Sequence, residues 1–246
     1  MSSPAGPAAP LLRVAGLCKH YGRIAALDDV AFEVREGEVL GVIGPNGAGK
    51  TTLFDCLSAL TPRDSGTLRW RGETLAPSQT GAHLFFLPDG IAPWPAQTVA
   101  WALDFFVGFF GGRADHVAST CDALHLDGLL DRPIGRLSKG QRKRALLALA
   151  MLSPQPLLLV DEPFDGLDLR QTRDVAEALR AHATDGRTVV LSIHQIADAA
   201  RVCDRFVLLS AGQVRGEGTL DELAAAAGDR GARAHDSLEE VFLALT

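Results

Sequence analysis

A glycine-rich segment that ends in lysine and threonine is the feature of this sequence best suited to chemistry. Residues 44–51 match the pattern G-x-x-x-x-G-K-S/T and directly follow Val39 to Ile43, an apolar run that predicts a buried strand. The backbone N–H groups of such a turn, at the start of a helix, form a concave site for phosphate oxygens. Lys50 adds positive charge at the β- and γ-phosphates, and the Thr51 hydroxyl can bind Mg²⁺. The residues that we expect to contact a nucleotide here are Gly44, Pro45, Asn46, Gly47, Ala48, Gly49, Lys50, Thr51 and Thr52.

Two adjacent carboxylates end a second apolar run, Leu157 to Val160. Because consecutive side chains of an extended segment point in opposite directions, we expect Asp161 and Glu162 to have different roles. Asp161 is placed to hold Mg²⁺ or its water, and Glu162 to activate the water that attacks the γ-phosphate. His194 closes a third apolar run, Thr188 to Ile193, and is a candidate for the same site because open α/β sheets bind ligands at the carboxyl ends of their strands. A purely structural histidine is the alternative.

A second anion site is predicted at the start of a helix near residue 138. Ser138 and Gln141 have the spacing of a capping box, so Ser138 should cap the helix. The free N–H groups of that first turn, near Gly140, favour an anion. A phosphate loop and a separate anion-binding helix start are unusual for one nucleotide. They suggest that two copies of the chain share each nucleotide.

The elements that must position these residues alternate along the chain. Apolar runs typical of buried strands occur at residues 39–43, 83–87, 157–160, 188–193 and 206–209. Helix patterns occur between them at residues 50–60, 96–110, 141–152 and 172–184. This alternation predicts an α/β fold with a mainly parallel sheet that is covered on both faces.

Three further segments depart from that alternation. Residues 12–40 alternate apolar and polar positions in short runs, as antiparallel strands do. Residues 89–136 are long and helical in pattern and lie between two core strands, which predicts an inserted helical subdomain. Capping-box spacing at Thr219 and Glu222, and again at Ser237 and Glu240, predicts two short C-terminal helices.

The composition is near the average of globular proteins, which excludes a disordered chain, a collagen and a coiled coil. The chain has 246 residues, of which 47% are hydrophobic, and 24 basic residues against 30 acidic ones give a net charge of −6, which argues weakly against nucleic-acid binding. Val99 to Gly112, interrupted by Asp104, is too short to span a bilayer. Residues 1–10 are rich in Pro and Ala and predict a disordered tail rather than a signal peptide, so we expect a cytoplasmic protein. Four dispersed cysteines predict buried reduced thiols.

One stretch is strongly basic despite the acidic total. Six cations fall within 13 residues that contain no acid: Arg132, Arg136, Lys139, Arg142, Lys143 and Arg144. A solvated helix face and an anion site are both consistent with this cluster.

Together these motifs resemble the nucleotide-binding subunit of ATP-binding cassette (ABC) transporters over nearly the whole chain, from about Leu11 to Leu245. By position, residues 44–51 are similar to the Walker A loop, 157–162 to the Walker B strand, 137–141 to the LSGGQ signature, 165–168 to the D-loop and His194 to the switch histidine. Tyr21 occupies the place of the aromatic residue that stacks on adenine, with an ordinary strand residue as the alternative.

The resemblance implies a fold and partners. The expected fold is a P-loop NTPase core with a mainly parallel sheet, an N-terminal antiparallel β subdomain and an inserted helical subdomain at about 89–153, all within residues 11–246. The expected assembly is a head-to-tail dimer with a second copy or a paralogous ATPase subunit, which encloses two ATP with Mg²⁺. Ser138, Gly140 and Gln141 of one subunit would contact the ATP of the other. A transmembrane permease, rather than nucleic acid, would hold the protein at the inner face of the membrane.

Two positions depart from the family pattern. Lys139 replaces the second glycine of the signature, and we expect its side chain to point away from the phosphates. Asp89 stands where the family has a glutamine that contacts Mg²⁺ or the attacking water. An Asp side chain is shorter, so we expect Asp89 to join Thr51 and Asp161 at the metal through a water molecule.

The aromatic residues of the inserted segment and the overall function each have more than one interpretation. The inserted segment carries six of the 15 aromatic residues of the chain, among them Trp94, Trp101 and Phe105, either as core or as the groove for a permease. The closing residues 237–246 are similar to the ends of subunits that serve ABC-2-type exporters, which favours ATP-driven export. A soluble ABC ATPase without a transport role and an ATP-gated regulatory switch are the alternatives.

Overall fold

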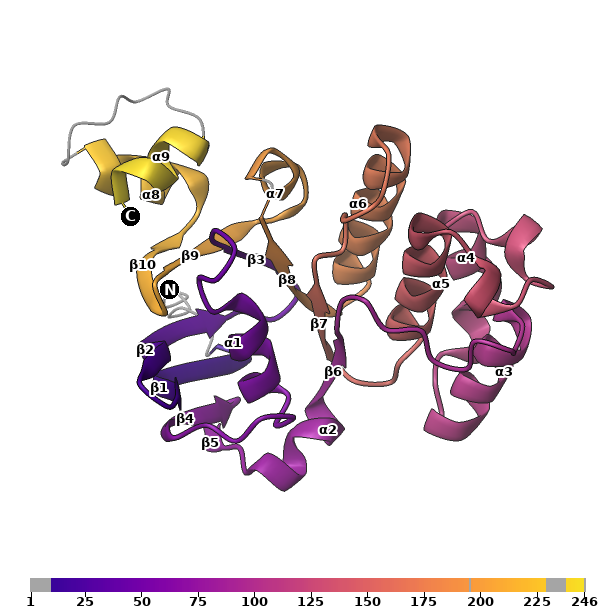
Figure 1. The fold of residues 1–246 in the computed structure, drawn as a ribbon, viewed down its shortest axis with the longest axis horizontal. Helices are drawn as coiled ribbons and strands as arrows, with labels where there is room; N and C mark the ends of the chain where they lie inside the picture. The colour runs from indigo at the N-terminus through magenta and orange to yellow at the C-terminus, as the bar shows by residue number, and fades with distance from the viewer. Residues whose placement is uncertain (1–9, 195, 229–237, 246) are drawn as a thin grey trace, which may run out of the picture.

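The chain forms two β-sheets connected by helices, and the first sheet is antiparallel (Figure 1). The computed structural model describes residues 10–194, 196–228 and 238–245, so the tail expected over residues 1–10 lies outside the described residues except for Pro10. The strand order of the first sheet is β2-β1-β4-β5. Its strands are β1 (Leu12–Tyr21), β2 (Ile24–Val34), β4 (Ser65–Trp70) and β5 (Glu73–Thr74). The antiparallel pairing of β1 with β2 is as predicted, whereas the apolar patterns do not predict β4 and β5.

The second sheet has six strands in the order β10-β9-β3-β8-β7-β6, and its neighbours are parallel except for β10 and β9. Its strands are β3 (Val39–Ile43), β6 (Leu84–Leu87), β7 (Leu157–Asp161), β8 (Thr188–Ile193), β9 (Arg205–Ser210) and β10 (Gln213–Gly218). The parallel strands coincide within a residue with the apolar runs of the sequence, which confirms the mainly parallel sheet. Because β3, β8 and β7 are neighbours, their carboxyl ends meet at one edge of the sheet.

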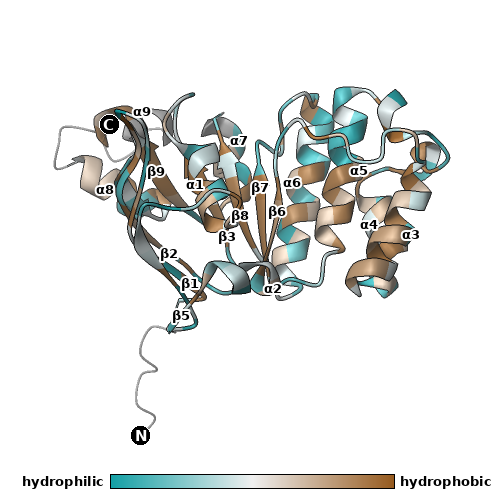
Figure 2. Ribbon diagram, turned by 60° about the horizontal axis from the view of Figure 1, so that its bottom comes forward, coloured by the Kyte–Doolittle hydropathy of each residue, from teal (hydrophilic) through white to brown (hydrophobic). Residues whose placement is uncertain are grey.

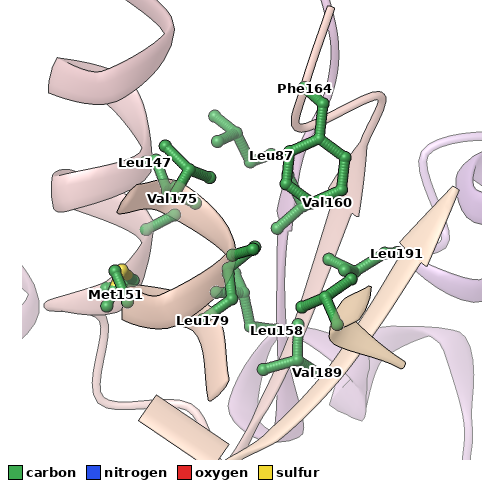
Figure 3. Close-up of a cluster of buried hydrophobic side chains, with 14 of the residues drawn as sticks. Leu87, Leu147, Met151, Leu158, Val160, Phe164, Val175, Leu179, Val189 and Leu191 are labelled. Carbon is green, nitrogen blue, oxygen red and sulfur yellow. The ribbon is translucent and has the colours of Figure 1, made fainter. Parts of the chain in front are cut away.

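Both faces of β3, β7 and β8 are buried, which explains why their sequences are almost continuously apolar. In β7, Leu158 and Val160 face one apolar cluster, and Leu157 and Leu159 face another. Figure 3 shows the first cluster, in which side chains from two helices cover β7 and β8. The helix residues labelled there are Leu147, Met151, Val175 and Leu179. The second cluster includes residues of the first sheet and Leu53, Phe54 and Leu57 of the helix that follows β3.

The helices are α1 (Lys50–Leu57), α2 (Thr80–His83), α3 (Val99–Phe110), α4 (Val117–Ala123), α5 (Lys139–Met151), α6 (Leu169–Thr184), α7 (Ile196–Val202), α8 (Leu220–Gly228) and α9 (Leu238–Leu245). α1, α3, α5 and α6 begin and end within three residues of the predicted positions, whereas the sequence patterns do not predict α2 and α7. The first ends before the predicted Leu60 because Ala59 has a left-handed φ of 61°. Thr219 and Glu222 make the predicted reciprocal cap of α8, whereas Ser237 lies outside the described residues.

The helical segment interrupts the second sheet along the chain but not in space. α3, α4 and α5 all lie between β6 and β7 in sequence, and Figure 1 shows them grouped at one end of the molecule. β6 nevertheless pairs with β7, with Leu84 opposite Leu157 and Leu87 opposite Val160. β6 is the edge strand of this sheet. The insertion therefore connects two neighbouring strands whose carboxyl ends lie near the phosphate loop.

Candidate nucleotide site

The loop between β3 and α1 forms a turn that requires glycine. Gly47 and Gly49 have φ values of 81° and 106°, in the left-handed region. A Cβ on Gly49 would lie 2.5 Å from the carbonyl oxygen of Ala26, so a side chain would not fit. The loop leads directly into α1, whose first residue is Lys50. The N–H groups at the start of α1 therefore border the turn, as an anion site requires.

The Lys50 side chain is buried against this loop, with 6% of its surface exposed. Its Nζ donates to the carbonyl oxygens of Gly44 at 2.7 Å and Pro45 at 3.3 Å. The same atom lies 3.6 Å from Oε1 of Glu162. The charge of Lys50 is therefore fixed between the phosphate loop and the end of β7.

Asp161 and Thr51 meet where β7 ends. The Thr51 hydroxyl donates to Oδ2 of Asp161 at 3.1 Å, and the Ser192 hydroxyl donates to its Oδ1. Asp161 is 5% exposed, and Ser192 is fully buried in β8. Sequence analysis missed Ser192, although a lone hydroxyl in an otherwise apolar strand is a recognisable signal, because a buried hydroxyl needs a partner.

Glu162 has a different environment from Asp161, because β7 ends at Asp161 and Glu162 lies just beyond the strand. Its backbone is left-handed, with φ of 50°. Its Oε1 faces Lys50, and its Oε2 lies 2.5 Å from Nδ1 of His194. The structure therefore brings Lys50, Glu162 and His194 together from the ends of three different segments.

Lys50 and Glu162, but not His194, are among the residues that line an open cleft of about 730 Å³, a volume suited to a small-molecule ligand. The residues that line it are Ile24, Ala25, Ala26, Asn46, Gly47, Gly49, Lys50, Thr51, Thr52, Asp89, Asp161, Glu162, Ala211 and Gly212. Tyr21 is absent from this set, and 49% of its surface is exposed. Lys19 Nζ lies 5.4 Å from the centre of its ring. Ile24, Ala25 and Ala26 of β2 are the apolar residues that border the cleft on that side.

The residues present fit Mg²⁺ when phosphate oxygens complete its shell. The Thr51 hydroxyl and the Asp161 carboxylate are the hard oxygen ligands that Mg²⁺ prefers. Within the described parts of the chain, no three His, Cys, Asp or Glu residues form a complete metal site. Such a sparse donor set is typical of Mg²⁺ that arrives with a nucleotide.

Comparison with known proteins identifies the family. The ABC transporter family matches residues 27–165, more than half of the chain. The chain belongs to this family. The Nod factor export ATP-binding protein I of Ralstonia nicotianae is 34% identical over 89% of this chain and 71% of its own length. The hemin import ATP-binding protein HmuV of Streptomyces coelicolor is 36% identical over 89% of this chain and 82% of its own length.

Solved structures confirm the fold. The structure of an ATP binding subunit of an ABC transporter superposes with a TM-score of 0.84 at 30% identity, over 96% of this chain and 99% of that chain. This protein is therefore an ATP-binding subunit of an ABC transporter, a family of ATPases coupled to transport. Among the residues that the structure describes, every helix is too short or too polar to cross a lipid bilayer.

The signature segment of this ABC subunit lies apart from its own cleft. The Ser138 hydroxyl accepts from the Gln141 N–H at 3.2 Å, and Gln141 Oε1 accepts from the Ser138 N–H at 3.1 Å, which confirms the predicted cap of α5. Ser138, Gly140 and Gln141 are not among the described residues that line the cleft. Gly140 packs against the loop before α6, because a Cβ there would lie 2.9 Å from the carbonyl oxygen of Gly166.

Lys139, the residue that departs from the signature, contacts the D-loop of the same chain. Its Nζ donates to Oδ2 of Asp165 at 2.5 Å, and its aliphatic stem lies against Gly166. This hydrogen bond lowers the pKa of Asp165 and raises the pKa of Lys139. The substituted side chain is therefore directed to a partner in its own subunit.

Asp89, the other departure, lies at the rim of the cleft but has a cation as its partner. Its Oδ1 accepts from Lys143 Nζ at 2.5 Å. Asp89 and Asp161 line both the nucleotide cleft and a smaller cleft beside α5. Contact of Asp89 with Mg²⁺ through water stays a prediction.

The basic cluster is not a solvated helix face throughout. Lys143 and Arg144 are buried, at 9% and 8% exposure. Arg144 Nη1 donates to the carbonyl oxygens of Leu124 at 2.8 Å and His125 at 3.1 Å. Lys143 and Arg144 therefore hold α5 against its neighbours, and the solvated interpretation is wrong for these two residues.

The aromatic residues of α3 divide into a buried and an exposed set. Phe106 is buried together with Val99, Ala102 and Leu103 on one face. The opposite face exposes a stacked ladder, in which the ring centres of Trp101 and Phe105 lie 5.0 Å apart, and those of Phe105 and Phe109 5.7 Å apart. Figure 2 shows α3 as a hydrophobic helix at one end of the molecule. We call Trp101, Phe105, Phe109 and Phe110 the aromatic face.

Proposed function

We propose that this chain hydrolyses ATP in a head-to-tail dimer, with a second copy or a paralogous subunit, and that hydrolysis drives transport through a separate permease. The observation that carries the proposal is the convergence of Lys50, Asp161 and Glu162 on one cleft, with His194 in contact with the Glu162 carboxylate. Family membership supports the ATPase and its coupling to transport. The arrangement of these four residues supports their individual roles.

Each residue has a distinct task at the phosphates. Lys50 and the N–H groups of the loop bind the β- and γ-phosphates. Glu162 accepts a proton from the attacking water, and His194 holds the Glu162 carboxylate through the contact to Oε2. Mg²⁺, held by Thr51, Asp161 and Asp89, would neutralise phosphate charge as hydrolysis proceeds. The adenine would lie over the β1–β2 end of the cleft, within reach of Tyr21.

A second subunit would complete the site. Ser138, Gly140 and Gln141 surround the start of α5, where unpaired N–H groups favour an anion, but they do not line the cleft of their own chain. A head-to-tail arrangement would bring them to the γ-phosphate bound by the partner. We take the inserted segment to extend over about residues 89–153, so the signature residues belong to it.

The aromatic face is the proposed docking site for the permease. Phe109 has 70% of its surface exposed and Phe110 42%, and Trp101 and Phe105 are each 39% exposed. Contiguous exposed aromatic residues are typical of protein interfaces. Docking there would hold the subunit peripherally at the inner face of the membrane, without nucleic acid as a partner.

We propose export as the direction of transport. The Nod factor export relative and the resemblance of residues 237–246 to exporter subunits support it. The hemin import relative is the reason for a separate test. Once the permease has been isolated with this subunit, export predicts ATP-driven accumulation of substrate in inside-out vesicles, and accumulation only in right-side-out vesicles would refute it.

Glu162→Gln tests the proposed catalysis and the dimer together. The amide cannot accept the proton of water, so hydrolysis should slow by about 10²-fold or more while ATP still binds. The dimer should then accumulate with ATP and Mg²⁺ and be visible by size-exclusion chromatography. Glu177→Gln, on the exposed side of α6, is the matched control and should behave as wild type. A monomer with normal turnover would refute both parts of the proposal.

A further inference from the structure

Lys143 is a buried cation beside the nucleotide cleft. It lies in α5 and is 9% exposed. Its Nζ donates to Oδ1 of Asp89 at 2.5 Å and to the carbonyl oxygen of Glu162 at 2.7 Å. Burial leaves little water to replace these partners, so losing them would be costly. Lys143 therefore joins α5 to two segments that border the cleft, the loop after β6 and the end of β7.

Glu162 needs such support because its backbone is in an unfavourable conformation. A left-handed φ of 50° is uncommon for a residue with a Cβ and persists only where the surroundings hold it. The Glu162 N–H donates to the Ser192 carbonyl at 3.2 Å and hydroxyl at 3.0 Å. The Glu162 carbonyl accepts from Lys143 and, at 3.3 Å, from the Asp165 N–H.

The contact from Lys143 is the shorter of the two at this carbonyl, and it comes from a charged donor. Charge-assisted hydrogen bonds are roughly twice as strong as neutral ones. Lys143 therefore makes the stronger of the two contacts that hold the Glu162 carbonyl. Lys143 is not among the described residues that line the nucleotide cleft, so its effect reaches the cleft through its partners.

We propose that Lys143 is a positioning residue for ATP hydrolysis. It fixes the backbone of Glu162 so that the carboxylate reaches the attacking water. Through its second bond, to Asp89, it makes that alignment depend on the loop after β6. The proposal rests on the catalytic role proposed for Glu162, and it gives the substituted Asp89 a function in this chain.

Lys143→Met removes both hydrogen bonds while nearly preserving side-chain volume. The turnover number should fall by about 10- to 100-fold, because small misplacements of a catalytic group have effects of that size. The Michaelis constant and the measured affinity for ATP should change less than about two-fold, since Lys143 does not contact the nucleotide. Lys143→Arg, which keeps the charge and the donors, should recover most of the rate.

A matched control separates positioning from the general loss of a buried lysine. Lys19 is also 9% exposed, and its Nζ bonds one carbonyl oxygen, of Pro62 at 2.8 Å, and one carboxylate, of Asp64 at 3.4 Å. Lys19→Met should lower the melting temperature as much as Lys143→Met does, with little change in turnover. Equal losses of turnover in the two variants would overturn the proposal.

Single-turnover hydrolysis in a Glu162→Gln background shows whether Lys143 acts through Glu162. If it does, adding Lys143→Met should cause little further loss, because residues that act as a unit are not additive. A full additional loss would overturn the proposal. If Glu162→Gln alone hydrolyses ATP at the wild-type rate, the catalytic assignment of Glu162 fails instead, so the two failures are distinct.

Asp89→Asn tests the second bond. The amide oxygen can still accept from Lys143, so the turnover number should fall less than in Lys143→Met. If Lys143→Met does not fold, Lys143→Gln replaces it, because the amide keeps one donor group. A larger loss in Asp89→Asn than in the Lys143 variant would show that Asp89 acts independently and would overturn the link to the loop after β6.

Discussion

At the scale of single residues, Lys50 combines burial with a position at the phosphate loop. Lys50→Ala should weaken ATP binding by about 100-fold, since losing a charged hydrogen bond costs roughly 1.5–3 kcal/mol. Isothermal titration with ATP, alongside thermal melting, measures this. Lys19→Ala, at a buried lysine outside the cleft, should retain wild-type affinity. Unchanged affinity in Lys50→Ala would remove the loop from the nucleotide site.

Ser192 is a second residue whose removal should affect the site selectively. Its hydroxyl donates to Asp161 and accepts from the Glu162 N–H. Ser192→Ala leaves a buried carboxylate oxygen without its donor, at a cost of about 1–3 kcal/mol of folding free energy. We also expect turnover to fall and the Mg²⁺ concentration for half-maximal activity to shift. ATPase assays across a Mg²⁺ titration check this, and an unchanged titration curve with normal turnover would contradict it.

The sequence alone predicts those site residues whose spacing is local. Lys50 and Thr51 follow one loop, and Asp161 and Glu162 lie at the end of one strand. The local sequence pattern is therefore enough to place each pair at the site. The partners Ser192 and Lys143 come from β8 and α5, and only the folded chain reveals that they meet at Glu162. The sequence shows that Asp89 departs from the family pattern. It does not show that Lys143 is the partner of Asp89, because the two residues are far apart in the sequence.

At the scale of elements, α6 carries a buried histidine with a direct effect on stability. Burial, with the positive charges of Arg187 and Arg113 nearby, lowers the pKa of His182 from 6.5 to about 4, against a smaller opposing effect of Asp185. The unfolded chain therefore binds a proton first as the pH falls. The free energy of unfolding should decrease as the pH falls from 6.5 toward 4, by up to about 3 kcal/mol.

His182→Gln tests this contribution because glutamine does not titrate. Urea unfolding of both proteins across the same pH range should show a smaller decrease in the variant. His20→Gln, at a half-exposed histidine in β1, is the control and should retain the decrease seen in the wild type. Parallel pH profiles in wild type and His182→Gln would contradict the prediction.

Element boundaries follow from the sequence where a side chain sets them. The cap at Ser138 starts α5 where the pattern predicts, and Asp168 starts α6 by accepting from the Gln171 N–H at 2.9 Å. β4 and β5 escape prediction because pairing forms them, β4 with the distant β1 and β5 with β4, and because Leu68 is the only residue of the two strands that is buried. Local pattern therefore fails where tertiary pairing decides.

At the scale of the whole molecule, the aromatic face should determine whether the subunit reaches the membrane. Phe109→Glu places a charge on an exposed, stacked ring and should release the protein from a permease while leaving its own ATPase activity intact. Co-sedimentation with membranes measures this. Leu60→Glu, at an exposed apolar residue outside the aromatic face, should remain bound. Loss of folding in Phe109→Glu would instead assign this ring to the core.

The edge position of β6 also has a consequence for the order in which the protein is made. Leu84 to Leu87 leave the ribosome before the whole of α3, α4 and α5, but among the described strands β6 pairs with β7 alone, and β7 follows those helices. Closing so long a loop costs chain entropy, whereas the contacts within the helical segment are local and form sooner. β6 is therefore an unpaired apolar strand during synthesis, and unpaired apolar strands promote the aggregation of nascent chains. Pulse-labelled hydrogen exchange should accordingly find the β6 amides that bond to β7 among the last in the second sheet to gain protection.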